Sequence, residues 1–564
     1  MTAIPSSPLQ RFLASQPGSF LADRLFVQRR RTRFLADIAH SHSRQQVIFA
    51  QLVQRGQATR FGREHDFARL RTVADYQAAV PVRGYPNLRP WIDAMLYDRE
   101  PDVLWPGQVD WFAESSGTSG AKKQIPVTRD GLRTVYQATA IQYVALLLAR
   151  LDQRRFLAGK TIFFVGSVRQ AEHNPRVLLA DITGLNVHLF PNWLEFTRTP
   201  GKEISLLPDW EARLYRMAEA TLRENVVHLA GLPTWIRHFG RIVRETTGVA
   251  TLREIWPNLI ATTCGGVNPA PYLPEINRLI LGDAAGDASL LHSETYNGTE
   301  GFYAAQFDAG PMALLPNAGI FYEFVPRREA EAGNFRGAVP LAGVEKGGDY
   351  APVITTGNGL WRYLIGDTVR FVSTAPYRVE VSGRISQFLS LTGEELLVHT
   401  TDAVLGEVCA DWRVGLVDYT ATGLRLVDAP EYACHLWLVE LAEDTPDPAA
   451  FAAALDRTLI ASHYDYAKAR SRGTESAAGF GLAAPLVLFL PAGSFQRWLA
   501  DRLGGRVGGQ SKVPRLSHSP ATAQALLFSL PADVRAGIFS SVPASLSPSL
   551  HLALDHFGEA PGQR

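Results

Sequence analysis

The chain has 564 residues, and its 56 Lys and Arg against 55 Asp and Glu give a formal net charge of +1 at pH 7. Proteins that bind nucleic acid usually carry a basic excess or a basic stripe, whereas charge here is mixed along the chain. Hydrophobic residues make up 46% of the chain and charged residues 20%, which excludes global disorder. We therefore expect a folded protein that binds no nucleic acid.

The chain contains three cysteines, Cys264, Cys409 and Cys434, and no CxxC pair. Neither a disulfide framework nor a cysteine zinc site is predicted. The first residues lack the continuous apolar core of a signal peptide, and the apolar run Tyr143–Ala149 is far shorter than the roughly 20 residues that span a membrane. We expect a cytoplasmic protein with no membrane partner.

The segment from about Phe20 to Arg55 contains no Gly or Pro, and its apolar residues recur every three or four positions. This spacing predicts a helix. The basic run Gln28–Arg33 inside it has two interpretations, a nucleic-acid patch or the solvated face of an amphipathic helix. The apolar neighbours Leu25 and Phe34 favour the solvated face.

Short β-rich runs such as Lys160–Ser167 then alternate with helical stretches such as Trp210–Asn225, which predicts an α/β domain of layered sheets and helices. After Gly383 the pattern restarts as a compact α+β unit. We predict a large N-terminal domain over residues 1–385 and a smaller, mobile C-terminal domain over residues 386–516. The remainder, residues 517–564, is rich in Ser, Pro and Ala and is predicted to be a partly ordered tail.

The clearest local signal is Glu114–Thr128, a segment dense in hydroxyl side chains and glycines and followed by two lysines. Its hydroxyl residues are Ser115, Ser116, Thr118 and Ser119, its glycines Gly117 and Gly120, and its lysines Lys122 and Lys123. Glycines let backbone N–H groups converge on an anion, hydroxyls donate hydrogen bonds and lysine neutralises charge. A phosphate-binding loop is favoured over the alternative, a surface turn.

Three further segments suit a nucleotide. Tyr296–Glu300 (YNGTE) combines an aromatic ring, a turn, a hydroxyl and a carboxylate, although such a sequence is often an ordinary turn. Arg362–Asp367 (RYLIGD) ends an apolar run in an Asp that can accept hydrogen bonds from a ribose diol or simply cap a turn. Gly508–Arg515 (GGQSKVPR) places Lys512 on a glycine-rich loop, where a lysine is commonly just exposed to solvent.

The order of these motifs resembles that of the adenylate-forming enzyme superfamily. More specifically, the segments SSGTSGAKKQIPVT, WPNL, FYEFVP, RYLIGD, SGRISQFLSLTGEEL and GGQSKVPRL are similar to the Gretchen-Hagen-type (auxin-responsive) acyl acid amido synthetases, and the chain looks like a bacterial-type member. The resemblance covers about residues 20 to 520. Two departures are a Thr at position 299, where the family usually has Ser, and the tail after Ser517.

The resemblance implies a role for each matching residue. It assigns the ATP phosphates to the loop residues Ser115, Ser116, Gly117, Thr118, Ser119 and Lys123. It assigns adenine to Tyr296, Gly265 and Gly266, the ribose to Asp367, the α-phosphate to Thr299 and Mg²⁺ to Glu300. It also places Arg384 in the ATP site just before the hinge between the domains, Lys512 as the catalytic lysine of adenylation, and Pro233 and Trp235 in the acyl-substrate pocket.

The activity that the resemblance implies uses ATP and Mg²⁺ to activate a small carboxylic acid as acyl-AMP, with release of pyrophosphate. The acyl group then passes to an amine, expected to be an amino acid, and forms an amide. One alternative is an acyl-CoA or carrier-protein ligase, which would form a thioester. Another is a non-catalytic nucleotide-binding protein, against which Glu300, Asp367 and Lys512 argue.

Overall fold

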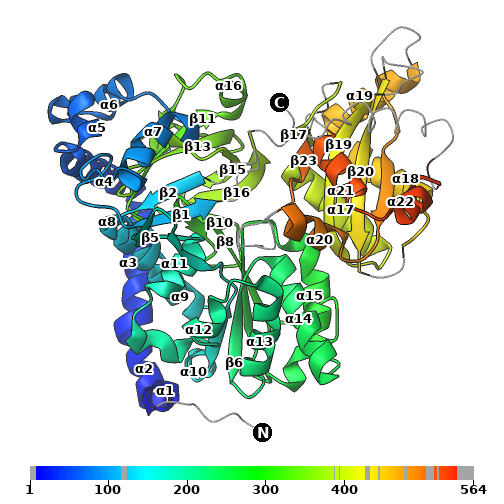
Figure 1. The fold of residues 1–564 in the computed structure, drawn as a ribbon, viewed down its shortest axis with the longest axis horizontal. Coiled ribbons are helices and arrows are strands. Elements are labelled where there is room, and N and C mark those ends of the chain that lie inside the picture. The colour runs from blue at the N-terminus through cyan, green and yellow to red at the C-terminus, as the bar shows by residue number, and fades with distance from the viewer. Residues whose placement is uncertain are drawn as a thin grey trace. The chain divides into compact units, whose positions relative to one another are not determined.

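The computed structural model of the chain describes residues 8–115, 123–385, 388–392, 394, 396–425, 432–442, 445–475, 481–502, 513–517, 520–540 and 542. The chain folds as two compact units (Figure 1). The larger unit is formed mainly by residues up to Pro269 and by Ile276–Val381, and the smaller by Ala270–Glu275 and most described residues from Ser382 onward.

The larger unit begins with helices. They are α1 (Pro8–Ala14), α2 (Gln16–Ala22), η1 (Asp23–Gln28), α3 (Arg29–Ala39), α4 (Ser41–Gly56), α5 (Arg60–Glu64), η2 (Phe67–Arg69), α6 (Val73–Ala79) and α7 (Tyr85–Leu96). The helix predicted from Phe20 to Arg55 is therefore interrupted at His40, whose φ of −117° and ψ of 34° are not helical. Arg29, Arg31 and Arg33 are exposed while Phe34 is buried, so the basic run is a solvated helix face, as the apolar neighbours predict.

A four-stranded sheet carries the two ends of the predicted phosphate loop. Its strands lie in the order β2 (Lys123–Val127), β1 (Trp111–Ser115), β5 (Asn174–Ala180) and β4 (Val168–Ala171). The helices that follow β2 are α8 (Arg129–Gly131), η3 (Leu132–Gln137), α9 (Ala138–Leu148) and α10 (Gln153–Leu157).

The second sheet of the larger unit has four neighbouring parallel strands, β3 (Lys160–Phe163), β6 (Val226–Gly231), β7 (Ala261–Gly265) and β8 (Leu291–Gly298). The helices between them are α11 (Ile182–His188), η4 (Asn192–Thr197), α12 (Lys202–Ser205), α13 (Trp210–Thr221), α14 (Pro233–Thr247), η5 (Leu252–Glu254), η6 (Ala270–Tyr272) and α15 (Leu273–Leu281). β6 is buried along almost its whole length, as expected for a parallel strand covered on both faces. In open sheets of this kind ligands bind at the carboxyl ends of the strands.

The same sheet continues as antiparallel strands. They are β9 (Gly301–Ala305), β10 (Met312–Leu314), β11 (Ile320–Pro326), β12 (Val339–Pro340), β13 (Asp349–Thr356), β14 (Tyr363–Leu364), β15 (Asp367–Thr374) and β16 (Tyr377–Arg384), with α16 (Arg327–Glu331) and η7 (Leu341–Gly343) between them. Aromatic side chains dominate the core on this side, and Trp361 is fully buried there with its Nε1–H donating to the Leu104 carbonyl at 2.9 Å.

The smaller unit is a five-stranded sheet with helices on both faces (Figure 1). Its elements are β17 (Phe388–Leu389), β18 (Leu396–Leu397), α17 (Val398–Asp411), β19 (Leu416–Arg425), β20 (Tyr432–Leu441), α18 (Pro448–Ser462), α19 (Tyr464–Glu475), β21 (Gly481–Leu482), β22 (Leu486–Leu490), α20 (Ser494–Arg502), β23 (Leu516–Ser517), α21 (Ala521–Phe528) and α22 (Ala532–Ser540). Successive residues of β20 face opposite cores: Trp437 packs with residues of α17 and α18, and Leu438 with residues of α20 and α21.

The segment predicted as a partly ordered tail contains α21 and α22. Leu526, Leu527 and Leu530 are buried in the core that β20 shares with α20, so this part of the tail belongs to the smaller unit.

All three cysteines are buried. Cys264, Cys409 and Cys434 are 1%, 4% and 1% exposed, and none of them forms a disulfide. Burial raises the pKa of the Cys264 and Cys434 thiols to about 12. Within the described residues, no helix combines the length and the apolar character needed to cross a bilayer.

Candidate active site

The β8–β9 hairpin presents the two central residues of the YNGTE segment. Gly298 pairs with Gly301, so Thr299 and Glu300 form its two-residue tip. Their side chains are only 2% and 7% exposed, and neighbouring phenols hold the tip from two sides. Tyr136 donates its hydroxyl hydrogen bond to the Thr299 carbonyl at 2.7 Å, and Tyr363 donates to Glu300 Oε1 at 3.2 Å.

The residues predicted for adenine and ribose lie beside each other. The Tyr296 hydroxyl donates to Asp367 Oδ2 at 3.0 Å. Asp367 opens β15 directly after Gly366, whose φ of +96° is a conformation that favours glycine. The RYLIGD turn therefore places a carboxylate beside the strand that carries Tyr296.

Gly265 ends β7 next to the same strand. It pairs with Thr295, and a Cβ at Gly265 would lie 2.8 Å from Asn297 Oδ1 and 2.9 Å from Thr295 Oγ1. Only glycine therefore lets these side chains lie against the β7 backbone. Gly266 follows with a φ of +83°. The two glycines predicted to approach adenine thus lie at the carboxyl end of β7, beside β8.

The predicted phosphate loop begins and ends at one point of the four-stranded sheet. Ser115 ends β1 and pairs with Lys123, the first residue of β2. Glu114 Oε1 is held by Arg169 at 2.6 Å. The residues between, 116–122, include the predicted Ser116, Gly117, Thr118 and Ser119 and lie outside the described residues.

A chain of hydrogen bonds connects the exit of this loop to the hairpin tip. The Thr128 amide donates to Asn358 Oδ1 at 3.1 Å, and Asn358 Nδ2 donates to the Tyr136 hydroxyl at 3.0 Å. Tyr136 in turn holds the Thr299 carbonyl. Asn358 and Tyr136 lie in none of the motifs found in the sequence, because each is an ordinary residue type whose role depends on a contact distant in sequence; Tyr363 lies within RYLIGD, but no role was predicted for it.

Lys512 also lies outside the described residues, but the segment after it is anchored in the smaller unit. Arg515 forms an ion pair with Asp418 and donates to the Tyr419 carbonyl at 2.8 Å and to the Tyr272 hydroxyl. Thr420 Oγ1 donates to the Pro514 carbonyl at 2.7 Å. Arg384 is the last residue of β16, three residues beyond the end of the larger unit at Val381.

The residues predicted for the acyl pocket follow β6. Pro233 is the first residue of α14 and is buried, and Trp235 is 7% exposed. The Trp235 ring lies 4.2 Å, centroid to centroid, from the Trp210 ring at the start of α13. Both tryptophans therefore lie near the carboxyl end of β6.

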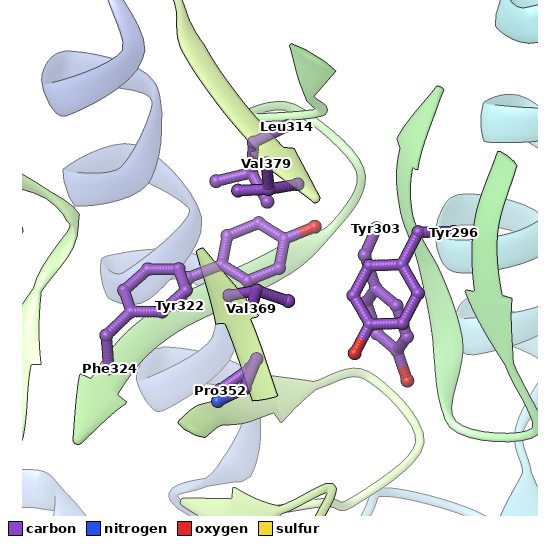
Figure 2. A pocket seen from close by; sticks show the side chains of 8 residues that line it. All are labelled: Tyr296, Tyr303, Leu314, Tyr322, Phe324, Pro352, Val369 and Val379. Atoms are coloured by element: carbon purple, nitrogen blue, oxygen red, sulfur yellow. The ribbon is translucent and has the colours of Figure 1, made fainter. Parts of the chain in front are cut away.

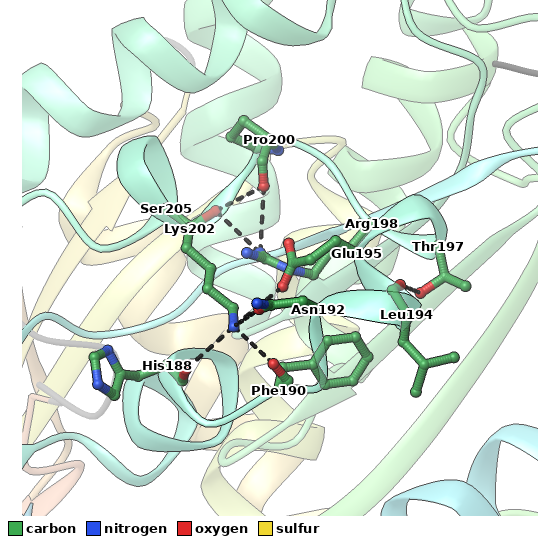
Figure 3. A network of polar contacts seen from close by, with 10 residues as sticks. All are labelled: His188, Phe190, Asn192, Leu194, Glu195, Thr197, Arg198, Pro200, Lys202 and Ser205. Atoms are coloured by element: carbon green, nitrogen blue, oxygen red, sulfur yellow. Dashed lines mark hydrogen bonds and ion pairs between the residues drawn. The ribbon is translucent and has the colours of Figure 1, made fainter. Parts of the chain in front are cut away.

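A polar network joins residues of the segment from His188 to Ser205, which precedes α13 (Figure 3). The Lys202 ammonium donates to the Phe190 carbonyl at 2.6 Å and lies 3.6 Å from Glu195 Oε1. Glu195 also binds Arg198 at 2.8 Å, and Arg213 of α13 donates to the Ser205 carbonyl at 3.2 Å. This network fixes the segment from His188 to Ser205 against the helix that carries Trp210.

A small apolar cavity lies behind Tyr296 (Figure 2). Its volume is about 10 Å³, the size of a single water molecule. It is lined by Tyr296, Tyr303, Leu314, Tyr322, Phe324, Pro352, Val369 and Val379. A cavity of this size has no room for a substrate.

Glu300 fits the demands of a magnesium–nucleotide complex. Mg²⁺ that arrives with phosphates needs only one or two protein carboxylates, and its remaining ligands are phosphate oxygens and water. The described residues contain no group of three or more His, Cys, Asp or Glu side chains able to hold a metal. A single nearly buried carboxylate beside the Thr299 hydroxyl suits that arrangement.

Comparison with known proteins identifies the family and the fold. The GH3 family N-terminal domain matches residues 30–183, the GH3 family central domain residues 312–384 and the GH3 family C-terminal domain residues 399–521. The solved structure of GH3.15 acyl acid amido synthetase covers 87% of this chain and 94% of its own, with a TM-score of 0.69 and 17% sequence identity. That similarity establishes the fold.

Two relatives are enzymes from plants. Jasmonoyl–L-amino acid synthetase JAR4 of Nicotiana attenuata is 24% identical in an alignment of 363 positions, which covers 52% of this chain and 60% of that protein, less than two thirds of its length. Indole-3-acetic acid-amido synthetase GH3.15 of Arabidopsis thaliana is 25% identical in an alignment of 446 positions, which covers 64% of this chain and 71% of that protein. Because the three domain matches follow one another in order and together cover more than half of the chain, the chain belongs to the GH3 family.

Proposed function

We propose that the chain is an acyl acid amido synthetase that adenylates a carboxylic acid with ATP and transfers the acyl group to the amine of an amino acid. Membership of the GH3 family and the activities named for the plant relatives support this proposal. The observation that carries it is the hydrogen bond from Tyr296 on β8 to Asp367 on β15. The hairpin tip that follows Tyr296 presents Thr299 and Glu300. We also propose that the protein is cytoplasmic.

The nucleotide would bind at the carboxyl ends of β7 and β8. Tyr296 offers an aromatic face to adenine, and the glycines after β7 let the base approach the backbone. Asp367 would accept hydrogen bonds from the ribose diol. The Thr299 hydroxyl would donate to the α-phosphate, and the loop from Ser115 to Lys123 would hold the remaining phosphates with its hydroxyls, backbone amides and lysines.

Glu300 would hold Mg²⁺, which when bound neutralises phosphate charge. Tyr363 keeps the Glu300 carboxylate oriented through its hydrogen bond to Oε1. Lys512, expected from the smaller unit, would place its ammonium beside the negative charge that develops between the acid and the α-phosphate. Positioning and electrostatic stabilisation would supply most of the rate enhancement.

In the first half-reaction a carboxylate oxygen attacks the α-phosphorus, and the bond to the β-phosphate oxygen breaks as pyrophosphate leaves. In the second, the amine nitrogen attacks the acyl carbonyl, the bond to AMP breaks, and an amide forms with loss of a proton. Pro233 and Trp235 would form an apolar wall of the acyl pocket. Between the two steps the smaller unit would rotate, which removes Lys512 and admits the amine.

The experiment that tests this proposal is ATP–pyrophosphate exchange with aryl, indolyl and aliphatic acids, in the presence of Mg²⁺ and without amine. We expect acid-dependent exchange, and the acids that support it define the acyl substrate class. Amino acids added next should release AMP and yield an amide. Release of AMP with a thiol acceptor instead would identify a thioester ligase. ATP binding without pyrophosphate exchange and without acceptor-dependent turnover would contradict the proposal that the protein is an enzyme.

A further inference from the structure

Arg213 places a charge on the buried face of α13. The other buried residues of this helix recur at helical spacing and are uncharged: Trp210, Leu214, Met217, Ala218 and Thr221. Arg213 lies among them and is only 1% exposed. A buried charge is costly unless it is paired, and an apolar side chain of similar length would fill this position without that cost.

Part of the Arg213 guanidinium has no hydrogen-bond partner among the described residues. Nη1 donates to the Ser205 carbonyl at 3.2 Å, whereas Nε and Nη2 are buried and make no hydrogen bond. These two nitrogens share one edge of the planar guanidinium, so covalent geometry alone makes them a fork of two donors. Such a fork matches the two oxygens of a carboxylate.

Two protein carboxylates attract Arg213 without filling this fork. Burial lowers the pKa of Arg213 to about 10, and the charges of Asp181 and Asp209 oppose that effect, so the group stays charged at neutral pH. Each aspartate caps a helix: Asp181 accepts from the Thr183 amide and Asp209 from the Ala212 amide, both at 2.8 Å. In the part of the chain that the structure describes, neither accepts a hydrogen bond from Nε or Nη2.

A second buried arginine at the same serine shows the contrast. Arg198 donates to Ser205 Oγ at 3.3 Å and is 4% exposed, but its Nε binds Glu195 at 2.8 Å (Figure 3). Arg198 thus has a carboxylate partner within the protein. The Arg213 fork has none, so a carboxylate from outside the protein would complete it.

The Arg213 guanidinium lies beside the residues proposed for the acyl pocket. Its Cζ is 4.8 Å from the centroid of the Trp210 ring. The Trp210 ring in turn packs 4.2 Å from the Trp235 ring, centroid to centroid. The apolar wall proposed for the acyl pocket and an unfilled carboxylate fork therefore contact the same tryptophan.

We propose that Arg213 binds the second carboxylate of a dicarboxylic acyl substrate through Nε and Nη2. The apolar middle of the acid would pack against Trp210 and Trp235, and its other carboxylate would react with ATP. Because Arg213 is shielded from solvent, the Trp210 ring that lies against it would move as the acid enters. This inference rests on the proposed function and on the proposed acyl pocket, and it names the substrate class of that pocket.

The test uses pairs of acids that differ in the second carboxylate: adipic with hexanoic acid, and terephthalic with benzoic acid. ATP–pyrophosphate exchange without amine gives kcat/KM for each acid. The unmodified protein should prefer the diacid of a pair. Arg213→Met should lower the ratio of diacid to monoacid about 10- to 100-fold, because charge-assisted hydrogen bonds are lost. Arg213→Lys should also lower it, since lysine keeps the charge but not the fork.

Thermal unfolding gives a second readout that requires no turnover. The diacid that supports exchange should raise the unfolding temperature of the unmodified protein more than its monoacid partner does, and this difference should vanish in Arg213→Met. Without ligand, Arg213→Met should unfold at the same or a higher temperature, because a buried charge with unfilled donors has been removed. A purely structural arginine would instead give a lower unfolding temperature and an unchanged ratio of diacid to monoacid.

Arg216→Met is the matched control, because Arg216 lies three residues further along α13 at an exposed position. It changes the net charge equally and should leave the diacid preference unchanged. An unmodified protein that exchanges with monoacids but shows no diacid preference, or equal ratios in Arg213→Met and the unmodified protein, would overturn this inference alone. If Arg213→Met failed to fold, an undiminished diacid preference in Arg213→Lys would overturn it.

Failure of the proposed function would look different. If no acid supported exchange in the unmodified protein, the proposed adenylation would be contradicted. Thermal unfolding with adipic and terephthalic acid would still decide the role of Arg213: stabilisation that Arg213→Met abolishes would support a carboxylate site, and no stabilisation would overturn it.

Discussion

Glu294 is a carboxyl group whose ionisation opposes folding. It lies on β8 two residues before Tyr296, and burial, assisted by the nearby Glu380, raises its pKa to about 7 from 4.5. The folded protein therefore binds this proton more tightly than the unfolded chain. The stabilisation that the proton provides is complete below pH 4.5 and is lost as the pH rises through about 7.

Glu294→Gln should remove this dependence, because glutamine resembles the protonated acid. Above pH 7 the variant should be more stable than the unmodified protein by about 1–3 kcal/mol, since each pKa unit corresponds to about 1.4 kcal/mol. Below pH 4.5 the two should be alike. Urea unfolding across this pH range measures the difference, with Glu219→Gln on the exposed face of α13 as the control. If the free energies of unfolding of Glu294→Gln and of the unmodified protein changed with pH in the same way, the raised pKa of Glu294 would be contradicted.

Lys512 is the residue on which the proposed adenylation step depends most. Lys512→Ala should lower acid-dependent pyrophosphate exchange on the order of 10²-fold, because one preorganised charge-stabilising donor is lost. Lys346→Ala, in an exposed turn before β13, should leave exchange unchanged. Undiminished exchange in the Lys512 variant would remove this lysine from the mechanism.

At the scale of elements, Asn358 connects two parts of the site that are distant in sequence. The Asn358 side-chain amide accepts a hydrogen bond from the backbone amide of Thr128, which caps α8 just after β2. It also donates to the Tyr136 hydroxyl, which holds the β8–β9 tip. A Cβ at Gly131 would lie 1.7 Å from Asn358 Oδ1, so the helix must carry glycine there. The exit of the predicted phosphate loop and the tip therefore form one hydrogen-bonded assembly.

Asn358→Ala should weaken that assembly. It leaves the buried Thr128 amide without its acceptor and removes the hydrogen bond that the Tyr136 hydroxyl accepts, and such a loss costs about 1–3 kcal/mol of stability. ATP affinity should fall as well, because Tyr136 then holds Thr299 less firmly. Thermal unfolding and ATP titration measure the two effects, and Asn334→Ala at an exposed position provides the comparison. If Asn358→Ala bound ATP as tightly as the unmodified protein, Asn358 would have no role in ATP binding.

The sequence predicted those parts of the site that depend on short segments. YNGTE was expected to be a turn with a hydroxyl and a carboxylate, and Thr299 and Glu300 do occupy a hairpin tip. The Gly366 turn before Asp367 is equally local. The bond between Asn358 and Tyr136 joins residues 222 positions apart, so no short pattern could reveal it.

The same distinction holds for secondary structure. Periodicity predicted helix from Phe20 to Arg55, but not the break at His40, where neither Gly nor Pro marks an end. Composition described the segment after Ser517 by its Ser and Pro content. Its leucines pack into the core of the smaller unit, a tertiary contact that composition does not record.

For the molecule as a whole, the chain passes from the larger unit into the main part of the smaller unit at Val381–Ser382, within β16. Gly383, two residues after Val381, has a φ of +151°, which residues with side chains rarely adopt. If the smaller unit rotates between the half-reactions, the backbone at this position must change conformation. We predict that a residue with a side chain there hinders the change.

Gly383→Ala should slow amide formation more than pyrophosphate exchange, because exchange needs only one orientation of the units. A strain of about 1.4 kcal/mol corresponds to about a tenfold loss of rate. Gly347→Ala is the control, since Gly347 has a φ of +84° and open space around its Cβ position, but lies within the larger unit. Equal losses in both reactions would contradict a hinge at Gly383.

The burial of every native cysteine makes the chain convenient for labelling. Thiol reagents attack the thiolate of an accessible cysteine, so thiols that are shielded from solvent react slowly. Two cysteines introduced at exposed positions, one in each unit, could thus be coupled to a pair of fluorophores without first replacing Cys264, Cys409 or Cys434. Energy transfer between the dyes would then follow the smaller unit through a catalytic cycle in the otherwise native protein.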